Sequence, residues 1–368
     1  MGEHAVVYGR PALVAAVDLR LYARFSPCLA SPGTPRAPLR IALPGLFAGC
    51  EAGWPEILSY ARQARERWAG YAARPGPETF QSLRGTDPVH LVKVALGEAA
   101  AALSAAGSAS EEDAEEDGPL DLRVESHLPL GSGMGSSAAA AVAVVAGYRL
   151  FRRSDLDLEL DLPEILRLAH EVERRQHGTP SGVDAATVAH GGLLWARREG
   201  GAEGGDRGLT IEPLAARSPL LRQIRVYDSG PPAEATGAVV AAVRERAGRD
   251  PRGHERRLDR IEEATLGLRA ELESPTFDPL RVVELIRAAA AGLRELGVVP
   301  EAVQERIRQV EAAGGAAKIS GAGALRGGSA GIILAYHPEP DPMARLPALA
   351  LPQYPVHLGA AGLRREET

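Results

Sequence analysis

The chain has 368 residues, which is long enough for about two domains that need neither disulfides nor structural metals. Hydrophobic residues make up 45% and charged residues 24%, close to the average of globular proteins. A net charge of −6 argues against a general nucleic-acid binder and against a polybasic membrane-surface protein. A site for an anionic ligand must therefore be built locally, from glycine-rich backbone, helix N-termini or a metal.

The cysteines and the apolar stretches indicate the compartment. Cys28 and Cys50 are the only cysteines, and they form neither a metal-binding spacing nor a disulfide framework. No signal peptide is visible after Met1, and the longest nearly continuous apolar stretch, residues 138–147, is too short to cross a bilayer. The sequence predicts a cytoplasmic protein that binds neither nucleic acid nor a membrane.

The first third of the chain predicts a small sheet followed by helices. A loop with a short buried helix or strand leads to a strand around Leu19–Phe25. Residues 31–44 contain four prolines and form a loop or an edge hairpin. Helical patterns cover 54–71 and 90–106, and the acidic run 108–118 is typical of a solvated loop tip rather than a docking surface.

The remainder alternates strands and helices. The expected elements are a strand at 120–126, a glycine-rich turn at 128–137, helices at 138–151 and 163–176, a turn at 177–184, a helix from Asp184, a strand at 191–197, a glycine-rich tip at 200–208, a strand at 223–228 that opens a second domain, long helices through 297, a glycine-rich stretch at 321–331 and a strand at 332–336. This interspersed order favours an α+β or α/β class.

The glycine-rich turn before the third helix is the strongest local signal. Its glycines let successive N–H groups converge, and the following helix N-terminus adds partial positive charge, so the turn can hold a polyphosphate without side-chain cations. Ser136 and Ser137 could ligate Mg²⁺ or simply cap the helix. The turn is neither a Walker loop nor a dinucleotide turn, because it has no Gly-Lys-Ser/Thr and Ser136 stands where a third glycine belongs.

Two carboxylates and a second glycine-rich segment are further candidates. Glu173 could supply a hard oxygen ligand to Mg²⁺, or it is a surface acid. Asp184 could accept the proton of an attacking hydroxyl, or it caps a helix. The glycines from 321 to 331 allow close approach to a ligand, or they form a flexible connection. Among the nine histidines, those beside glycine turns are His4, His177 and His190.

Four segments, in family order, resemble the signatures of mevalonate kinases in the GHMP kinase superfamily. Gly2–Ala12 resembles the first signature, and Pro129–Ala138 resembles the ATP-binding signature. His177–Asp184 is similar to the segment that ends in the catalytic aspartate, and Lys318–Gly323 resembles the third signature. Together they cover most of the chain.

The resemblance implies an α+β, two-domain GHMP kinase fold. Residues 1–216 would form a domain like ribosomal protein S5 domain 2, and residues 217–368 a ferredoxin-like domain, with ATP and substrate meeting between them. The implied reaction is the ATP- and Mg²⁺-dependent phosphorylation of mevalonate in isoprenoid synthesis. The alternatives are another GHMP kinase, acting on phosphomevalonate or a sugar, and a non-catalytic regulatory protein of the same fold. A homodimer is the assembly that we consider.

The resemblance also implies a role for each matching residue. Asp184 would be the catalytic base, and Ser137 and Glu173 would ligate Mg²⁺. The residues expected around ATP are Pro129, Gly131, Ser132, Gly133, Met134, Gly135, Ser136, Ser137, Gly321 and Gly323. Those expected near the substrate are Glu3, His4, Gly182 and Thr236.

The chain departs from the family pattern in two places. The third signature is longer and less uniformly glycine than usual. In mevalonate kinases the first signature follows a strand carrying Ala-Pro-Gly-Lys, and this strand and its lysine are absent before Met1. Neither Lys93 nor Lys318 looks like a replacement for that lysine. We expect the natural protein to start roughly a dozen residues upstream, enough for one strand and its lead-in.

Overall fold

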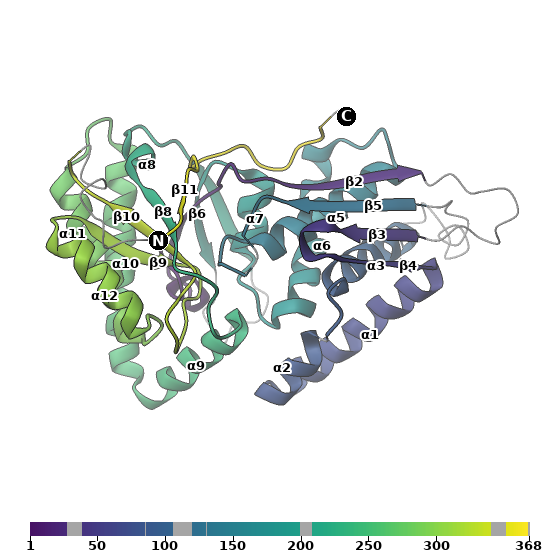
Figure 1. Cartoon of the computed structure of the whole chain (residues 1–368), viewed down its shortest axis with the longest axis horizontal. Helices are drawn as coiled ribbons and strands as arrows, with labels where there is room; N and C mark the ends of the chain where they lie inside the picture. Colours follow the sequence, from purple (N-terminus) through teal and green to yellow (C-terminus); the bar gives the residue numbers. More distant parts are fainter. Residues whose placement is uncertain are drawn as a thin grey trace, which may run out of the picture. The chain divides into compact units, whose positions relative to one another are not determined.

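The chain divides into two units that interleave along the sequence. The computed structural model describes residues 1–27, 39–84, 86–105, 120–129, 131–198, 208–339 and 351–366 (Figure 1). Unit 1 comprises Met1–Asp18, Pro129–Met134 and His190–Gly362. Unit 2 comprises Leu19–Leu128, Gly135–Ala189 and Leu363–Thr368. Cysteine 28, the acidic run 108–118 and nearly all of the tip at 200–208 lie outside the described residues.

Unit 2 is built on a four-stranded sheet in the order β2-β5-β3-β4. The strands are β2 (Leu21–Pro27), β5 (Leu120–Ser126), β3 (Leu39–Leu43) and β4 (Ala48–Ala52). The β3 and β5 strands run parallel, and the other neighbours are antiparallel. Alternate residues of β5 are buried, as the alternating sequence predicts. The β3 and β4 strands form a hairpin around the short 3-10 helix η2 (Pro44–Leu46), and this hairpin overlaps only the end of the segment 31–44 that was predicted as a loop or an edge hairpin.

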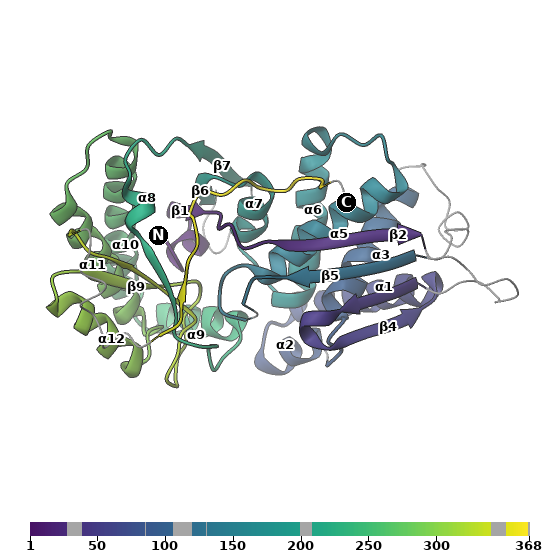
Figure 2. The same cartoon turned by 45° about the horizontal axis from the view of Figure 1, so that its top comes forward.

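The helices of unit 2 pack on one face of this sheet (Figure 2). They are α1 (Trp54–Ala73), α2 (Pro77–Arg84), α3 (His90–Ala105), α5 (Ser136–Arg152), α6 (Leu158–His177) and α7 (Val183–His190). The α5 helix lies at the centre of the core, because nearly every side chain from Ala138 to Val145 is buried. Small alanines let α3 and α6 approach it closely.

The α6 helix begins five residues before the predicted start at Pro163. Asp157 caps it, since its carboxylate accepts from the N–H groups of Glu159 and Leu160 at 2.8 and 3.3 Å. In the first turn, Asp161 forms a two-armed ion pair with Arg149 of α5, with N···O distances of 2.5 and 2.6 Å. The cap and the ion pair stabilise the first turn of α6, which lies before the proline that the sequence suggested as the start of the helix.

Unit 1 contains two antiparallel sheets. One has the order β1 (Ala12–Ala15), β6 (Leu193–Arg198), β7 (Leu209–Leu214). The other has the order β11 (Gln353–Tyr354), β8 (Arg225–Asp228), β10 (Ile332–Tyr336), β9 (Ala316–Ser320). Its helical segments are η1 (Ala5–Tyr8), α8 (Leu220–Gln223), α9 (Thr236–Arg249), α10 (Pro251–Glu273), α11 (Pro279–Leu296) and α12 (Glu301–Ala312).

The mixture of helices and sheets confirms the α+β class. The predicted division after residue 216 stays a prediction, and the two contact-defined units cross it. The reason is a shared core, in which Leu13 and Trp195 pack with side chains of α10 and α11. Among the described helices, none combines the length and the apolar character needed to cross a membrane.

Candidate active site

The glycine-rich turn has the backbone that its sequence predicts. Gly131, Gly133 and Gly135 have φ angles of 72, 84 and 73°, in the left-handed region that favours glycine. The turn belongs to unit 1 through Met134 and to unit 2 from Gly135 onward, so its two parts are described with their own units. Gly135 is the N-cap of α5, and Ser136 and Ser137 are the first helical residues. The simpler interpretation of a serine N-cap is therefore wrong, because the cap residue is a glycine.

A carboxylate and a histidine converge on the first turn of α5. The Ser137 hydroxyl donates to Oε1 of Glu173. Nε2 of His177 lies 3.1 Å from the same hydroxyl oxygen and 3.9 Å from Oε2 of Glu173. Glu173 and His177 are four residues apart on α6 and so share one face of the helix. We call these three residues, together with Asp184, the carboxylate cluster.

Glu173 is buried, with 5% of its surface exposed, so the alternative of a surface acid is wrong. Burial raises the pKa of its carboxyl to about 7, against the hydrogen bond from Ser137, which lowers it. A carboxylate buried to this extent favours either a proton or a bound cation.

Asp184 lies in the first turn of α7, directly after the Gly182 turn. Gly135 lies close to it, because a Cβ built at Gly135 would stand 3.9 Å from the Cβ of Asp184. Loss of surrounding water and repulsion from Glu173 raise the pKa of Asp184 to about 6, and His177 acts in the opposite direction.

The cluster suits a magnesium ion that is shared with a phosphate ligand. In the part of the chain that the structure describes, no three His, Cys, Asp or Glu side chains gather into a metal site of their own. Mg²⁺ sites of kinases typically use one or two carboxylates and complete the shell with substrate phosphates and water. The Glu173 carboxylate and the Ser137 hydroxyl, at the N-terminus of a 17-residue helix, fit that donor set.

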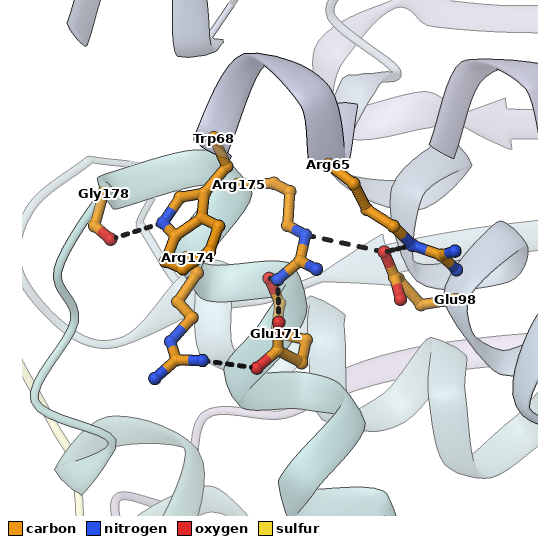
Figure 3. A network of polar contacts seen from close by, with 7 residues as sticks. All are labelled: Arg65, Trp68, Glu98, Glu171, Arg174, Arg175 and Gly178. Atoms are coloured by element: carbon orange, nitrogen blue, oxygen red, sulfur yellow. Dashed lines mark hydrogen bonds and ion pairs between the residues drawn. The ribbon is translucent and has the colours of Figure 1, made fainter. Parts of the chain in front are cut away.

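The far side of α6 is tied to α1 and α3 by a polar network (Figure 3). Nε1 of Trp68 donates to the Gly178 carbonyl at 2.9 Å, and the Arg174 guanidinium lies 5.3 Å from the Trp68 ring centre. Glu98 of α3 accepts from Arg65 at 2.9 Å and lies 3.5 Å from Arg175. These contacts hold the end of α6, where the chain turns towards Asp184.

Gly178 is required at that turn. Its φ of 78° lies in the left-handed region, and a Cβ there would stand 2.5 Å from the Tyr71 ring. The histidine before it and the aspartate after it are therefore placed by a turn that only glycine fits.

In unit 1, the residues of the first signature contact the third signature. Oε1 of Glu3 lies 2.5 Å from the Lys318 ammonium, which also donates to the Ile319 carbonyl at 2.6 Å. Burial alone would raise the pKa of Glu3, but the Lys318 charge and hydrogen bonds lower it to about 2. His4, whose φ is 59°, lies 2.9 Å through Nε2 from the Ala322 carbonyl. Burial lowers the pKa of His4.

The third signature approaches the first part of the glycine-rich turn. The Ile332 N–H donates to the Ser132 carbonyl at 3.1 Å, and a Cβ at Gly133 would stand 3.3 Å from the Ser320 carbonyl oxygen. Gly323 is equally constrained, since a Cβ there would meet the Val298 carbonyl at 2.2 Å. The glycines of this segment therefore allow close packing against neighbouring backbone, and the alternative of a merely flexible connection is wrong.

For three further residues that the sequence predicted for the site, the structure shows the position but not a role. Thr236 is exposed at the start of α9, Pro129 accepts from the Ser132 hydroxyl at 3.0 Å, and Gly182 has a φ of 81°. Sequence reasoning singled out His177 without assigning it a role, and it missed Trp68. It also gave no partner to Lys318, although the lysine is the first residue of the third signature. The assigned roles in ATP and substrate binding stay predictions.

We predict that Glu173→Gln stabilises the ligand-free protein at neutral and alkaline pH. Because the pKa of Glu173 rises from 4.5 to about 7 on folding, the folded state binds the extra proton, and the free energy of unfolding falls as pH increases through this window. Glutamine removes this penalty, at most about 3 kcal/mol, and still accepts from Ser137. In thermal unfolding without Mg²⁺ or nucleotide, the Tm of the variant relative to that of the wild type should increase from pH 5 to pH 8.

Glu171→Gln is the matched control on the same helix. The pKa of Glu171 is lowered, since Arg175 and Arg174 outweigh the opposing effect of burial, so this variant should lose stability at neutral pH. A pH-independent difference between Glu173→Gln and the wild type would contradict the prediction.

Comparison with known proteins finds similarity to GHMP kinases. Residues 94–192 match the family model for the GHMP kinases N terminal domain. The chain also has the fold of a solved mevalonate kinase from Methanococcus jannaschii, with a TM-score of 0.68, 17% identity and coverage of 97% of this chain and 94% of the other. Residues 94–192 are thus similar to the GHMP kinases N terminal domain, and the chain shares the fold of that solved mevalonate kinase.

Within this class the chain is similar to mevalonate kinases. The Pyrococcus abyssi mevalonate kinase is 30% identical over 195 residues, which are 53% of this chain and 47% of that protein. The Bos taurus mevalonate kinase is 29% identical over 359 residues, 90% of this chain and 82% of that protein. Against archaeal relatives such as the first, the chain spans less than half of their length.

Proposed function

We propose that the protein is an ATP- and Mg²⁺-dependent kinase that phosphorylates the primary hydroxyl of mevalonate to give 5-phosphomevalonate. The observation that carries this proposal is the carboxylate cluster at the N-terminus of α5, where a buried glutamate, a serine hydroxyl and an aspartate gather in one unit. Similarity to proteins named mevalonate kinase supports the choice of substrate. A cytoplasmic location and a homodimer are part of the same proposal.

The chain would bind the phosphates of ATP mainly through its backbone. The N–H groups of the first α5 turn point out of the helix end, and the helix dipole favours negative charge there. Ser137 and Glu173 would hold Mg²⁺, which supplies neutralisation of the charge that develops on the transferring phosphoryl group. Positioning and charge neutralisation account for most of the catalysis.

Asp184 would accept the proton of the attacking hydroxyl. The mevalonate oxygen forms a bond to the γ-phosphorus while the bond from that phosphorus to the bridging oxygen of ADP breaks, and the proton moves to the Asp184 carboxylate. A pKa near 6 leaves this carboxylate mostly ionised at neutral pH and makes it a better proton acceptor than an ordinary aspartate. Glu3, His4, Gly182 and Thr236 are proposed to lie near the mevalonate.

The test of the activity is ADP release with mevalonate, phosphomevalonate, galactose and homoserine as separate acceptors. Turnover of mevalonate above the other three is the expected result. Preference for another acceptor would make the protein a different GHMP kinase. ATP binding without turnover of any acceptor would favour a regulatory protein.

We predict that Ser137→Ala and Glu173→Gln both raise the Mg²⁺ concentration needed for half-maximal rate, because each removes an oxygen ligand of a hard cation. The expected increase is about tenfold or more, and it should be larger for Glu173, whose charge is lost. Mg²⁺ titrations at saturating ATP measure it. Ser126→Ala, in β5, is the control for serine loss. Unchanged titrations for both cluster variants would refute the metal assignment.

A further inference from the structure

His177 is a member of the carboxylate cluster for which the proposed reaction has no use. It is the last residue of α6, one turn beyond Glu173, and 22% of its side chain is exposed. Its Nε2 atom lies 3.1 Å from the Ser137 hydroxyl oxygen, the same oxygen that donates its proton to Glu173. The ring therefore contacts one candidate metal ligand and neighbours the other.

Counting protons defines what the ring does. A serine hydroxyl has one proton and two lone pairs, and an ionised carboxylate can only accept. When Glu173 is ionised, as a metal ligand must be, Ser137 directs its proton to Glu173. His177 must then donate from Nε2 into one lone pair of the Ser137 oxygen. One lone pair remains, and it is available to a hard cation.

We propose that His177 is a positioning residue for the magnesium site, which holds the Ser137 hydroxyl in the rotamer that presents this remaining lone pair to the metal. The inference rests on the proposed Mg²⁺-ATP function and adds to it a group that contacts no ligand of its own. A free serine hydroxyl rotates among three staggered positions. Fixing one of them in advance therefore lowers the conformational entropy that is lost when the metal binds.

The surroundings of His177 suit such a role. The Trp68 hydrogen bond to the Gly178 carbonyl fixes the backbone directly after the histidine (Figure 3). Gly178 is also packed against the Tyr71 ring. The backbone next to the His177 imidazole is therefore fixed by contacts with α1. Partners behind metal ligands typically change metal affinity by about 10–100-fold when they are removed.

The experiment compares three replacements that differ in where they place a donor. The amide of His177→Gln reaches about as far as Nε2, the amide of His177→Asn reaches only about as far as Nδ1, and His177→Leu has no donor. The Mg²⁺ concentration for half-maximal rate should rise about tenfold or more in the Leu and Asn variants and stay within about twofold in the Gln variant. The kcat at saturating Mg²⁺ should change little in all three.

A second readout does not depend on turnover. Mn²⁺ binding in the presence of ATP, followed by electron paramagnetic resonance, should weaken in the same order. In a Ser137→Ala background, His177→Leu should have no further effect, because the oxygen that it orients is gone. His127→Leu, which removes an exposed histidine of the same unit, is the matched control.

The outcomes separate the inference from the proposed function. Full Mg²⁺ affinity in His177→Leu, equal loss in the Gln and Leu variants, or an undiminished effect in the Ser137→Ala background overturns the inference alone. A wild-type protein that binds no Mn²⁺ with ATP overturns the proposed function, and the inference with it. Loss in Leu and Asn with rescue by Gln supports both.

Discussion

Replacing Asp184 by asparagine should lower kcat by about 10²–10⁴, the usual contribution of a general base. Asparagine keeps the size and the hydrogen-bonding shape of the side chain but cannot take up the proton of the attacking hydroxyl. Binding of Mg²⁺-ATP, measured by calorimetry, should be nearly unchanged, so the loss should fall on kcat and not on nucleotide affinity.

The wild type should show the same group in its pH profile. Because the pKa of Asp184 is raised to about 6, kcat/KM should fall as pH decreases through this value, and the fall should be absent from the residual activity of Asp184→Asn. The variant should fold at least as well as the wild type, since it removes a carboxylate that is repelled by Glu173. Turnover near the wild-type rate would reduce Asp184 to an acidic residue in the first turn of α7.

Replacing Lys318 by methionine should destabilise the protein by about 3–5 kcal/mol, the usual effect of breaking a buried ion pair from one side. Lys318 is 2% exposed, and its ammonium is the charge that lowers the pKa of Glu3 to about 2. Without it, the largely buried Glu3 carboxylate keeps as its cationic neighbour the Met1 ammonium, 3.8 Å away, and loses the closer charge. Denaturant unfolding at pH 7 measures the loss.

The pH dependence of this effect has a definite sign. A carboxyl whose pKa is lowered on folding, here from 4.5 to about 2, stabilises the folded state above pH 4.5, and this contribution disappears as pH falls towards 2. The difference between wild type and Lys318→Met should therefore shrink in acid. The double variant Glu3→Gln/Lys318→Met should be more stable than Lys318→Met, because it removes the carboxylate that the more distant Met1 ammonium, at 3.8 Å, pairs with less well than Lys318 does.

Lys93 provides the control, since it is the only other lysine of the chain. It pairs with Asp87 at 2.9 Å, but both side chains are partly exposed, so Lys93→Met should cost only about 1 kcal/mol or less. Equal losses for the two lysine variants would show that the Glu3 pair contributes no more than a surface ion pair.

Local sequence was sufficient for two of the strands and for the glycine-rich turn. The strands at 120–126 and 332–336 have the bounds that their apolar patterns predict. Glycines recur in the glycine-rich turn because three of its positions have positive φ, which other residues adopt at a cost. Such features depend on neighbours in the chain, and a short window of sequence therefore contains the whole physical reason.

The bounds of helices and the presence of short elements were harder to predict from the sequence. The start of α6 depends on an ion pair between Asp161 and Arg149 of another helix, and α2, β7 and α12 were not expected. Their sequences are polar or short, so their stability comes from packing against a core that is assembled from distant segments.

The sequence by itself predicted the α+β class and named the candidate groups, because Ser137 and Asp184 lie in recognisable segments and Glu173 lies on the predicted helix between them. Only the tertiary structure decided how they act on one another: that Glu173 is buried, that it shares the Ser137 hydroxyl with His177, and that Lys318 pairs with Glu3 across 315 positions. Burial and pairing are set by which helices and strands meet, and that depends on the packing of the whole unit rather than on any local pattern.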